Sequence, residues 1–266
     1  MDRRLALVTG ASAGIGAAFA RILASHGYDV ALTARRADRL DKLAEELSLR
    51  FGVEALTVTA DLAEPEAPGH ILDHLTAHGR TVDCLINNAG YGLSGVYADT
   101  RWEDQRAVIQ VMVTAPSELA HRVLPGMIHR KFGRIVNVAS LAGLIPGAAG
   151  ATLYGATKAF MVRFTQSLHL ETQGQGVHVS ALCPGFTLTE FHDVNGTRQR
   201  VTAATPRWAW HSAEAVAEAG WRAVEANRAM CVPGLAYKLI IGAAKLVPDS
   251  LALAVMRSQG HRFREL

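Results

Sequence analysis

The sequence is poor in cysteine, and this scarcity limits the chemistry open to it. Three cysteines in 266 residues are too few and too far apart for a disulfide framework or a zinc site. We therefore expect buried thiols in a reduced compartment, a cytoplasmic protein and no bound metal. The three are Cys84, Cys183 and Cys231.

Long apolar runs and clusters of positive charge are also missing. The apolar run that begins at Leu5 stops at Thr9, which is too short for the core of a signal peptide. The net charge is +3 and the arginines are scattered, so we expect no nucleic-acid partner. No repeat or low-complexity linker divides the chain, and its 49% hydrophobic content can fill a full core. We predict one domain over residues 1–266.

Apolar, β-branched segments alternate with amphipathic segments along the chain. This alternation predicts a doubly wound α/β fold, in which right-handed crossovers build a mostly parallel, seven-stranded sheet covered on both faces. The predicted strands are Leu5–Thr9, Asp29–Thr33, Ala55–Thr59, Cys84–Asn87, Arg134–Ala139, His178–Cys183 and a segment near Met230–Val232. The predicted helices are Ile15–His26, Ala37–Phe51, Glu66–His78, Trp102–Arg130, Leu153–Thr172 and Ser212–Ala226.

A glycine-rich segment joins the first predicted strand to the first predicted helix. Glycine lets the backbone turn sharply and approach a pyrophosphate, and the free N–H groups of the helix start face the anion. An ordinary strand–helix turn is the alternative, but this position in the chain is the one that a dinucleotide site requires. The predicted cradle of a Rossmann-type domain is formed by Gly10, Ser12, Gly14, Ile15 and Gly16.

The end of the second predicted strand indicates which dinucleotide is bound. An acidic residue there would hydrogen-bond a ribose 2′-hydroxyl, whereas this chain carries Arg35 and Arg36. Guanidinium groups pair bidentately with phosphate, so the sequence favours NADP(H) over NAD(H). The alternative is that both arginines are solvated residues at a helix start.

A tyrosine and a lysine provide the candidate catalytic group. Tyr154 and Lys158 are four residues apart in a predicted helix and therefore share one face. We expect the nearby ammonium to lower the pKa of the phenol toward the working range of an acid–base catalyst. Ser140 directly follows an apolar strand, and ligands of open parallel sheets bind at such strand ends.

Together these motifs resemble those of the short-chain dehydrogenase/reductase family, and the resemblance covers nearly the whole chain. Ser140, Tyr154 and Lys158 look like its catalytic triad, which implies that Tyr154 donates a proton to the developing alkoxide while Ser140 orients the carbonyl and Lys158 holds the nicotinamide ribose. The resemblance adds further cofactor-binding residues: Asp61 and Leu62 at the adenine; Asn88, Ala89 and Gly90 on the adenosine side; and Pro184, Gly185, Thr187 and Thr189 at the nicotinamide. It also implies a homodimer or homotetramer that pairs through residues 102–130 and 153–172.

One position departs from the family pattern. Members usually carry an asparagine that anchors a proton-relay water behind the lysine, and the matching residue here is Met112. A thioether is at best a weak acceptor and cannot donate. Two interpretations stay open: protons reach Lys158 by another water path, or catalysis is weakened and the protein acts mainly as an NADP(H)-binding regulatory or scaffold protein.

The substrate side is less regular. Residues 186–211 lose clear periodicity and gather aromatic side chains such as Trp208 and Trp210, which predicts either a lid over an apolar substrate or rings that pack the loop onto the sheet. Residues 235–266 form an apolar extension that is too short and too charged to span a membrane. An oligomer interface, a wall of a lipophilic pocket and a peripheral membrane anchor all remain open for it.

The leading hypothesis is an NADP(H)-dependent oxidoreductase. We expect it to transfer hydride between nicotinamide and a hydrophobic ketone, aldehyde or secondary alcohol, with a 3-oxoacyl or steroid-like compound as one class of substrate.

Overall fold

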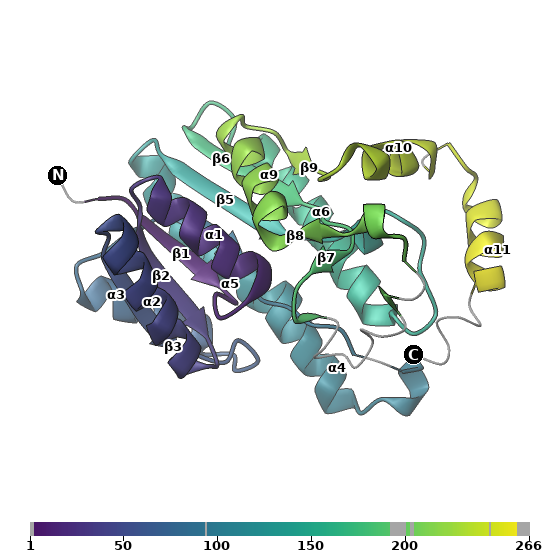
Figure 1. The fold of residues 1–266 in the computed structure, drawn as a ribbon, viewed down its shortest axis with the longest axis horizontal. Helices are drawn as coiled ribbons and strands as arrows, with labels where there is room; N and C mark the ends of the chain where they lie inside the picture. The colour runs from purple at the N-terminus through teal and green to yellow at the C-terminus, as the bar shows by residue number, and fades with distance from the viewer. Residues whose placement is uncertain (1–2, 94, 192–200, 203–204, 245, 260–266) are drawn as a thin grey trace.

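The computed structural model of the chain describes residues 3–93, 95–191, 201–202, 205–244 and 246–259. Its centre is a parallel sheet of seven strands in the order β3-β2-β1-β4-β5-β6-β9 (Figure 1). The predicted doubly wound α/β fold is confirmed. The strands are β1 (Leu5–Thr9), β2 (Asp29–Ala34), β3 (Ala55–Thr59), β4 (Val82–Asn87), β5 (Gly133–Val138), β6 (Val177–Leu182) and β9 (Met230–Cys231).

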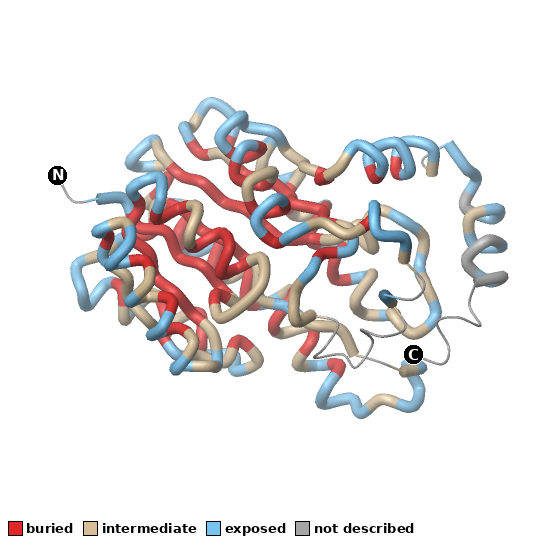
Figure 2. The backbone as a smooth tube through the Cα atoms, viewed as in Figure 1, coloured by how far each residue is buried: buried red, intermediate tan, exposed pale blue. Residues whose placement is uncertain are grey.

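Helices cover both faces of this sheet. The helices α1 (Gly14–Ser25), α2 (Ala37–Phe51) and α9 (Ala213–Glu225) share one hydrophobic cluster with the sheet. The helices α3 (Ala67–Ala77), α5 (Ala115–His129) and α6 (Thr152–Glu171) pack on the opposite face. In Figure 2 the inner strands β2, β1, β4, β5 and β6 are almost continuously buried, whereas the edge strands β3 and β9 are only partly buried.

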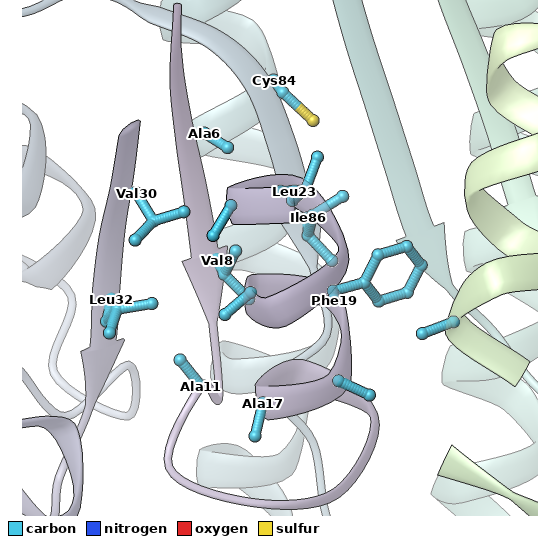
Figure 3. Packing of buried hydrophobic residues seen from close by; sticks show 14 of the residues in the cluster. Ala6, Val8, Ala11, Ala17, Phe19, Leu23, Val30, Leu32, Cys84 and Ile86 are labelled. Atoms are coloured by element: carbon cyan, nitrogen blue, oxygen red, sulfur yellow. The ribbon is translucent and has the colours of Figure 1, made fainter. Parts of the chain in front are cut away.

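The alternation of side chains along β1 explains why two cores form. Ala6 and Val8 lie in the cluster beneath α1, whereas Leu5 and Leu7 lie in the cluster on the other face. Figure 3 shows Phe19 of α1 among the apolar side chains of the first cluster, and this side chain is 0% exposed. Burying a phenylalanine of this kind contributes about 1.5–3 kcal/mol.

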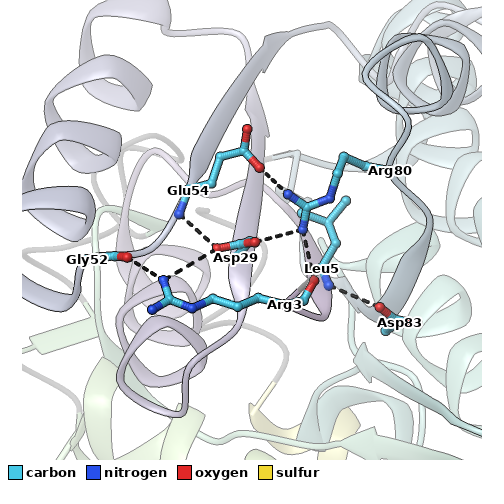
Figure 4. Close-up of polar contacts among 7 residues, drawn as sticks. All are labelled: Arg3, Leu5, Asp29, Gly52, Glu54, Arg80 and Asp83. Atoms are coloured by element: carbon cyan, nitrogen blue, oxygen red, sulfur yellow. Dashed lines mark hydrogen bonds and ion pairs between the residues drawn. The ribbon is translucent and has the colours of Figure 1, made fainter. Parts of the chain in front are cut away.

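A polar cluster closes the amino-terminal edge of the sheet (Figure 4). Asp29 is buried at the start of β2 and accepts hydrogen bonds from Arg80 Nη2 at 2.8 Å and from the backbone N–H of Glu54 at 2.8 Å. Arg80 also pairs with the carboxylate of Glu54 and donates to the carbonyl of Arg3. These contacts join β1, β2 and the segments before β3 and β4 at the edge opposite to the strand ends that carry the predicted site.

The long helix predicted over Trp102–Arg130 is wrong in one respect, because a π-helical segment interrupts it. The chain forms α4 (Trp102–Ile109), the π-helical segment Gln110–Thr114 and then α5. Pro116 has no N–H, so it cannot supply the hydrogen bond that an α-helix would direct to the carbonyl of Met112. Single π-turns inside helices occur frequently at functional sites.

The segment after β6 contains more structure than its lack of periodicity predicts. Two short parallel strands, β7 (Thr187–Leu188) and β8 (His211–Ser212), pair there, and a 3₁₀ turn spans Arg207–Ala209. Of the predicted lid over 186–211, residues 192–200 and 203–204 lie outside the described residues.

The predicted C-terminal extension contains the helices α10 (Leu235–Ala244) and α11 (Asp249–Gln259), which project away from the sheet in Figure 1. Tyr237 anchors α10, because its hydroxyl donates to the carbonyl of Ala209 at 2.6 Å and accepts from the N–H of Phe186 at 3.3 Å. Within the described part of the chain, no helix combines the length and apolarity needed to cross a membrane. Position 245 and residues 260–266 of the extension lie outside the described residues.

Candidate active site

The glycine-rich turn between β1 and α1 has the geometry of an anion cradle. Gly10 and Gly14 adopt positive φ angles of 65° and 55°, a region that residues with a side chain rarely enter. A Cβ on Gly16 would overlap the carbonyl oxygen of Gly10 and the Asn88 amide. Only glycine fits here, and the first turn of α1 leaves backbone N–H groups available to a phosphate. These residues therefore fit a dinucleotide pyrophosphate.

The end of β4 holds this turn in place. The Asn88 side chain donates to the carbonyls of Thr9 and Gly10 at 2.9 and 3.3 Å. The hydroxyl of Thr9 in turn accepts the backbone N–H groups of Asn88 and Ala89 at 2.9 and 3.0 Å. Because β1 and β4 are the neighbours at which the strand order reverses, the cradle lies at the topological switch point where open α/β sheets bind ligands.

The two arginines after β2 occupy different positions. The Arg36 guanidinium donates to Ser12 Oγ from Nε at 3.2 Å and from Nη2 at 2.9 Å, so it lies directly beside the cradle. Arg35 is mostly exposed, and its Nη1 lies 3.8 Å from Oδ2 of Asp61, just after the end of β3. Leu62 beside it is buried. The structure thus brings Arg36 to the cradle and leaves Arg35 on the side predicted for the adenine.

Sequence reasoning missed two charged residues beside Arg36, the cation Arg39 and the carboxylate Glu190. Arg39, in the first turn of α2, donates to the carboxylate of Glu190 at 2.6 Å, and Arg36 donates to the same carboxylate at 2.9 Å. Arg39 could have been found from its place three residues after Arg36 on one helix. Glu190 lies about 150 residues further along the chain, and no local pattern points to it.

The predicted triad comes together on β5 and α6. Tyr154 and Lys158 lie in the first two turns of α6, and Ser140 follows β5. The Ser140 hydroxyl lies close enough to the Tyr154 phenol to lower the pKa of that phenol. The Lys158 ammonium lies 5.8 Å from the centre of the Tyr154 ring and donates to the carbonyl of Val138 at 2.8 Å. The phenol, hydroxyl and ammonium are therefore arranged at one strand end.

The expectation that Lys158 lowers the Tyr154 pKa is wrong for this structure. Burial raises the pKa of Tyr154, and the nearby Ser140 hydroxyl lowers it by a smaller amount. Burial also lowers the pKa of Lys158 from 10.5 to about 8. The physical reason is desolvation, which disfavours the phenolate and the ammonium alike. The ammonium is directed to a backbone carbonyl rather than to the phenol oxygen.

The segment after β6, which the sequence predicts to lie at the nicotinamide, packs against the same strand ends. The carbonyl of Pro184 accepts the N–H of Leu141 at 3.0 Å, which ties this segment to the residue after Ser140. Thr187 pairs with β8, and Thr189 packs on the glycine turn, where a Cβ on Gly14 would lie 2.9 Å from its methyl group. Gly185 contacts the ring of Tyr237 so closely that a Cβ there would overlap it.

Met112 lies where the sequence placed it, behind Lys158. Both side chains lie against Gly90. A Cβ built on Gly90 would lie 3.0 Å from the Met112 sulfur and 3.5 Å from Lys158 Nζ. Met112 and Lys158 line a cavity of about 10 Å³ that Asn87 also lines. The Asn87 Oδ1 atom is buried and has no hydrogen-bond partner among the described residues. A volume of roughly 10–15 Å³ is the lower limit for one water molecule.

Comparison with known proteins decides the family. A model of the family described as short chain dehydrogenase matches residues 4–200. The chain belongs to the short-chain dehydrogenase family. Among its relatives, sulfoacetaldehyde reductase 2 of Chromohalobacter salexigens is 40% identical, over 70% of this chain and 74% of that protein.

Two further short-chain dehydrogenases extend the comparison. The NADP-dependent 3-hydroxy acid dehydrogenase of Salmonella typhi is 36% identical, over 82% of this chain and 87% of that protein. The solved structure of a short-chain dehydrogenase from Sphingobium yanoikuyae in complex with NADPH superposes with a TM-score of 0.80 at 32% identity, covering 91% of this chain and 94% of that one. Within the described residues of our short-chain dehydrogenase, no cluster of three or more His, Cys, Asp or Glu side chains is arranged to hold a metal ion.

Proposed function

We propose that the chain is an NADP(H)-dependent oxidoreductase that interconverts a hydrophobic ketone or aldehyde and the corresponding secondary or primary alcohol. The observation that carries the proposal is the arrangement of Ser140 and Tyr154 beside Lys158, at the strand end next to a cradle that only glycine can form. The bound dinucleotide supplies or accepts hydride. The protein supplies position and a proton.

Each residue of the triad has a distinct role in this proposal. Tyr154 donates its phenolic proton to the carbonyl oxygen of the substrate and takes it back in the alcohol direction. Ser140 hydrogen-bonds the same oxygen and fixes its distance from the phenol. Lys158, held by the carbonyl of Val138 at 2.8 Å, binds the ribose next to the nicotinamide. Because the Lys158 pKa lies at about 8, it can release and regain a proton near neutral pH.

The preference for NADP(H) rests on Arg36, Arg39 and Ser12. The guanidinium of Arg36 contacts the cradle through Ser12 Oγ, and Arg39 adds a second cation on the same helix turn. A 2′-phosphate on this cluster would form charge-assisted, bidentate hydrogen bonds. The NADPH complex of the Sphingobium protein and the NADP-dependent relative from Salmonella support the assignment.

The proposed substrate is apolar because Phe191 lies beside the Tyr154 phenol and further aromatic side chains gather on the segment after β6. The rings of Tyr154 and Phe191 lie 5.6 Å apart, and those of Phe186 and Trp210 lie 5.5 Å apart. Trp208 is 60% exposed near α10 and 6.4 Å from the Tyr237 ring. We extend the proposal to bulky ketones, 3-oxoacyl compounds and steroid-like compounds, for which such a surface provides contact area.

Turnover of a carbonyl panel tests the proposal. NADPH oxidation is followed with aliphatic, aromatic, 3-oxoacyl and steroid carbonyls, and each reaction is repeated with NADH. We expect at least one apolar carbonyl to be reduced faster with NADPH, and we expect Tyr154→Phe to lower kcat by about a hundredfold or more while NADPH still binds. Tyr97→Phe, at an exposed tyrosine on the 3₁₀ turn before α4, is the matched control. NADPH binding without turnover of any carbonyl would refute the enzymatic assignment.

The second candidate is an NADP(H)-binding regulatory or scaffold protein with weakened catalysis. Met112 favours it, because a buried thioether lies at the position from which the family asparagine reaches the relay water. The Oδ1 of Asn87, unpaired within the described part of the chain, lines the same cavity and favours the enzyme, since it offers an amide acceptor to one water beside Lys158. Met112→Asn separates the two: a large gain in kcat indicates a damaged relay, and an unchanged kcat indicates that protons already reach Lys158.

We further propose that residues 1–266 act as one domain and that the chain forms a homodimer or homotetramer. Large apolar side chains are exposed on the predicted pairing helices, Trp102 on α4 and Phe160 and Leu170 on α6. Light scattering of the wild type and of Leu170→Glu tests the pairing. The apolar faces of α10 and α11 add Leu239 and Leu251, both more than half exposed.

A further inference from the structure

Glu190 links the two ends of the cofactor site. Its carboxylate accepts hydrogen bonds from Arg36 Nη1 at 2.9 Å and from Arg39 Nη1 at 2.6 and 2.9 Å. The arginines belong to the start of α2, whereas Glu190 follows β7 on the nicotinamide-side segment. Hydrogen bonds from Arg39 and Arg36 hold the pKa of Glu190 below its usual range.

The Glu190 carboxylate is bound to Arg36 and Arg39, the two cations that the proposed function assigns to the 2′-phosphate. Arg36 contacts Ser12 with Nε and Nη2 and Glu190 with Nη1, so one guanidinium serves both the cradle and this carboxylate. A guanidinium offers a limited set of N–H groups in a fixed plane. An incoming dianion and the Glu190 carboxylate therefore compete for the same donors.

The same contact holds the nicotinamide-side segment against the glycine turn. Thr189, the neighbour of Glu190, packs on Gly14. Ser12, Gly14, Arg39, Thr189 and Glu190 line one open cavity of about 500 Å³. When Glu190 leaves the arginines, the backbone that carries Thr189 loses its tie to α2.

Resting on the NADP(H) assignment above, we propose that Glu190 is a specificity-determining residue that competes with the adenosine 2′-phosphate for Arg36 and Arg39. We name the contacts among these three residues the Glu190 latch. A dinucleotide that carries a 2′-phosphate displaces the carboxylate and opens the latch. A dinucleotide with a free 2′-hydroxyl lacks this second anion, and its pyrophosphate binds the glycine turn, so the latch stays closed. The latch thus couples recognition at the adenosine end to the segment beside the nicotinamide.

Two small ligands isolate this competition. Adenosine 2′,5′-bisphosphate carries the 2′-phosphate, 5′-AMP lacks it, and neither contains nicotinamide. Calorimetric titration compares the wild type with Glu190→Gln, which keeps the side-chain shape and removes the charge. We expect Glu190→Gln to bind the bisphosphate roughly two- to fivefold more tightly, the range for exposed ion pairs, and to bind 5′-AMP with unchanged affinity.

Glu214→Gln is the matched control. Glu214 lines the same cavity, is exposed in the first turn of α9, and interacts electrostatically with Arg21. We expect this variant to bind both ligands as the wild type does. An equal gain in Glu214→Gln would assign the effect to the general field of the cavity and overturn the latch. An unchanged or weaker affinity of Glu190→Gln for the bisphosphate would also overturn it.

Hydrogen exchange supplies a readout of the coupling. The bisphosphate should speed backbone exchange in residues 186–191 of the wild type, whereas 5′-AMP should leave it unchanged. Equal exchange with the two ligands would overturn the coupling. Failure of the wild type to bind either the bisphosphate or NADPH is a different result, because it removes the NADP(H) assignment and the latch together.

Discussion

Replacing Lys158 by methionine should change how the stability of the protein depends on pH. The side chain is 6% exposed, and burial lowers the pKa of the ammonium from 10.5 to about 8. The unfolded chain keeps this proton up to about pH 10.5, whereas the folded chain releases it near pH 8. Between these values the unfolded state binds more protons, so Lys158 makes the free energy of unfolding rise with pH.

The size of the effect follows from the two pKa values. Holding the charge in the folded protein at pH 7 costs on the order of 3 kcal/mol, at 1.36 kcal/mol for each pH unit between the two values. Methionine has a similar length and no charge, so this cost disappears. The variant also leaves the carbonyl of Val138 without its 2.8 Å hydrogen bond, which costs about 1–3 kcal/mol at every pH.

The pH dependence therefore separates the two contributions. Urea unfolding of the wild type and of Lys158→Met is measured from about pH 7 to about pH 10.5, the range set by the shifted pKa. The wild type should gain on the order of 3 kcal/mol relative to the variant across this range. Lys42→Met, at an exposed lysine of α2, should stay parallel to the wild type. Parallel curves for Lys158→Met would refute the buried charge.

Two further substitutions test the cradle and the polar core. Gly16→Ala should lower the free energy of unfolding by about 1–3 kcal/mol and weaken NADPH binding, because the new methyl group overlaps the turn. Thermal melting measures the loss of stability, and NADPH titration measures the loss of affinity. The control is Gly147→Ala, which should have little effect because the space around Gly147 is open. Asn137→Leu should cost about 2–4 kcal/mol in urea unfolding, because fully buried Asn137 accepts from Asn87 and donates to Thr165, both at 2.9 Å. A loss below about 1 kcal/mol would show that this network contributes little.

Local sequence signals predicted the sheet and the glycine turn between β1 and α1 well, because both depend on short-range physics. The β-branched runs predicted six strands to within two residues and located β9. Gly10, Gly14 and Gly16 marked the turn, because a side chain at any of these positions would strain the backbone or overlap a neighbour. The side-chain spacing on α6 likewise placed Tyr154 and Lys158 on one face.

Features that depend on tertiary contacts were not predictable in the same way. The π-helical segment arises within an otherwise helical pattern, and its cause at Pro116 is evident only once the hydrogen bonds are known. The direction of the Tyr154 pKa depends on burial and on where the Lys158 ammonium points. Glu190 meets Arg39 only because the crossovers bring β7 beside α2. Pairing between β7 and β8 has the same long-range origin.

The phenol of Tyr237 ties α10 to the segment that follows β6. Its ring lies against Gly185, and its hydroxyl joins the N–H of Phe186 to the carbonyl of Ala209. Force or crowding applied to α10 is therefore transmitted to the backbone that follows β6. A substitution that displaces the Tyr237 ring should therefore shift the backbone beside Gly185 and, with it, change which substrates the protein accepts.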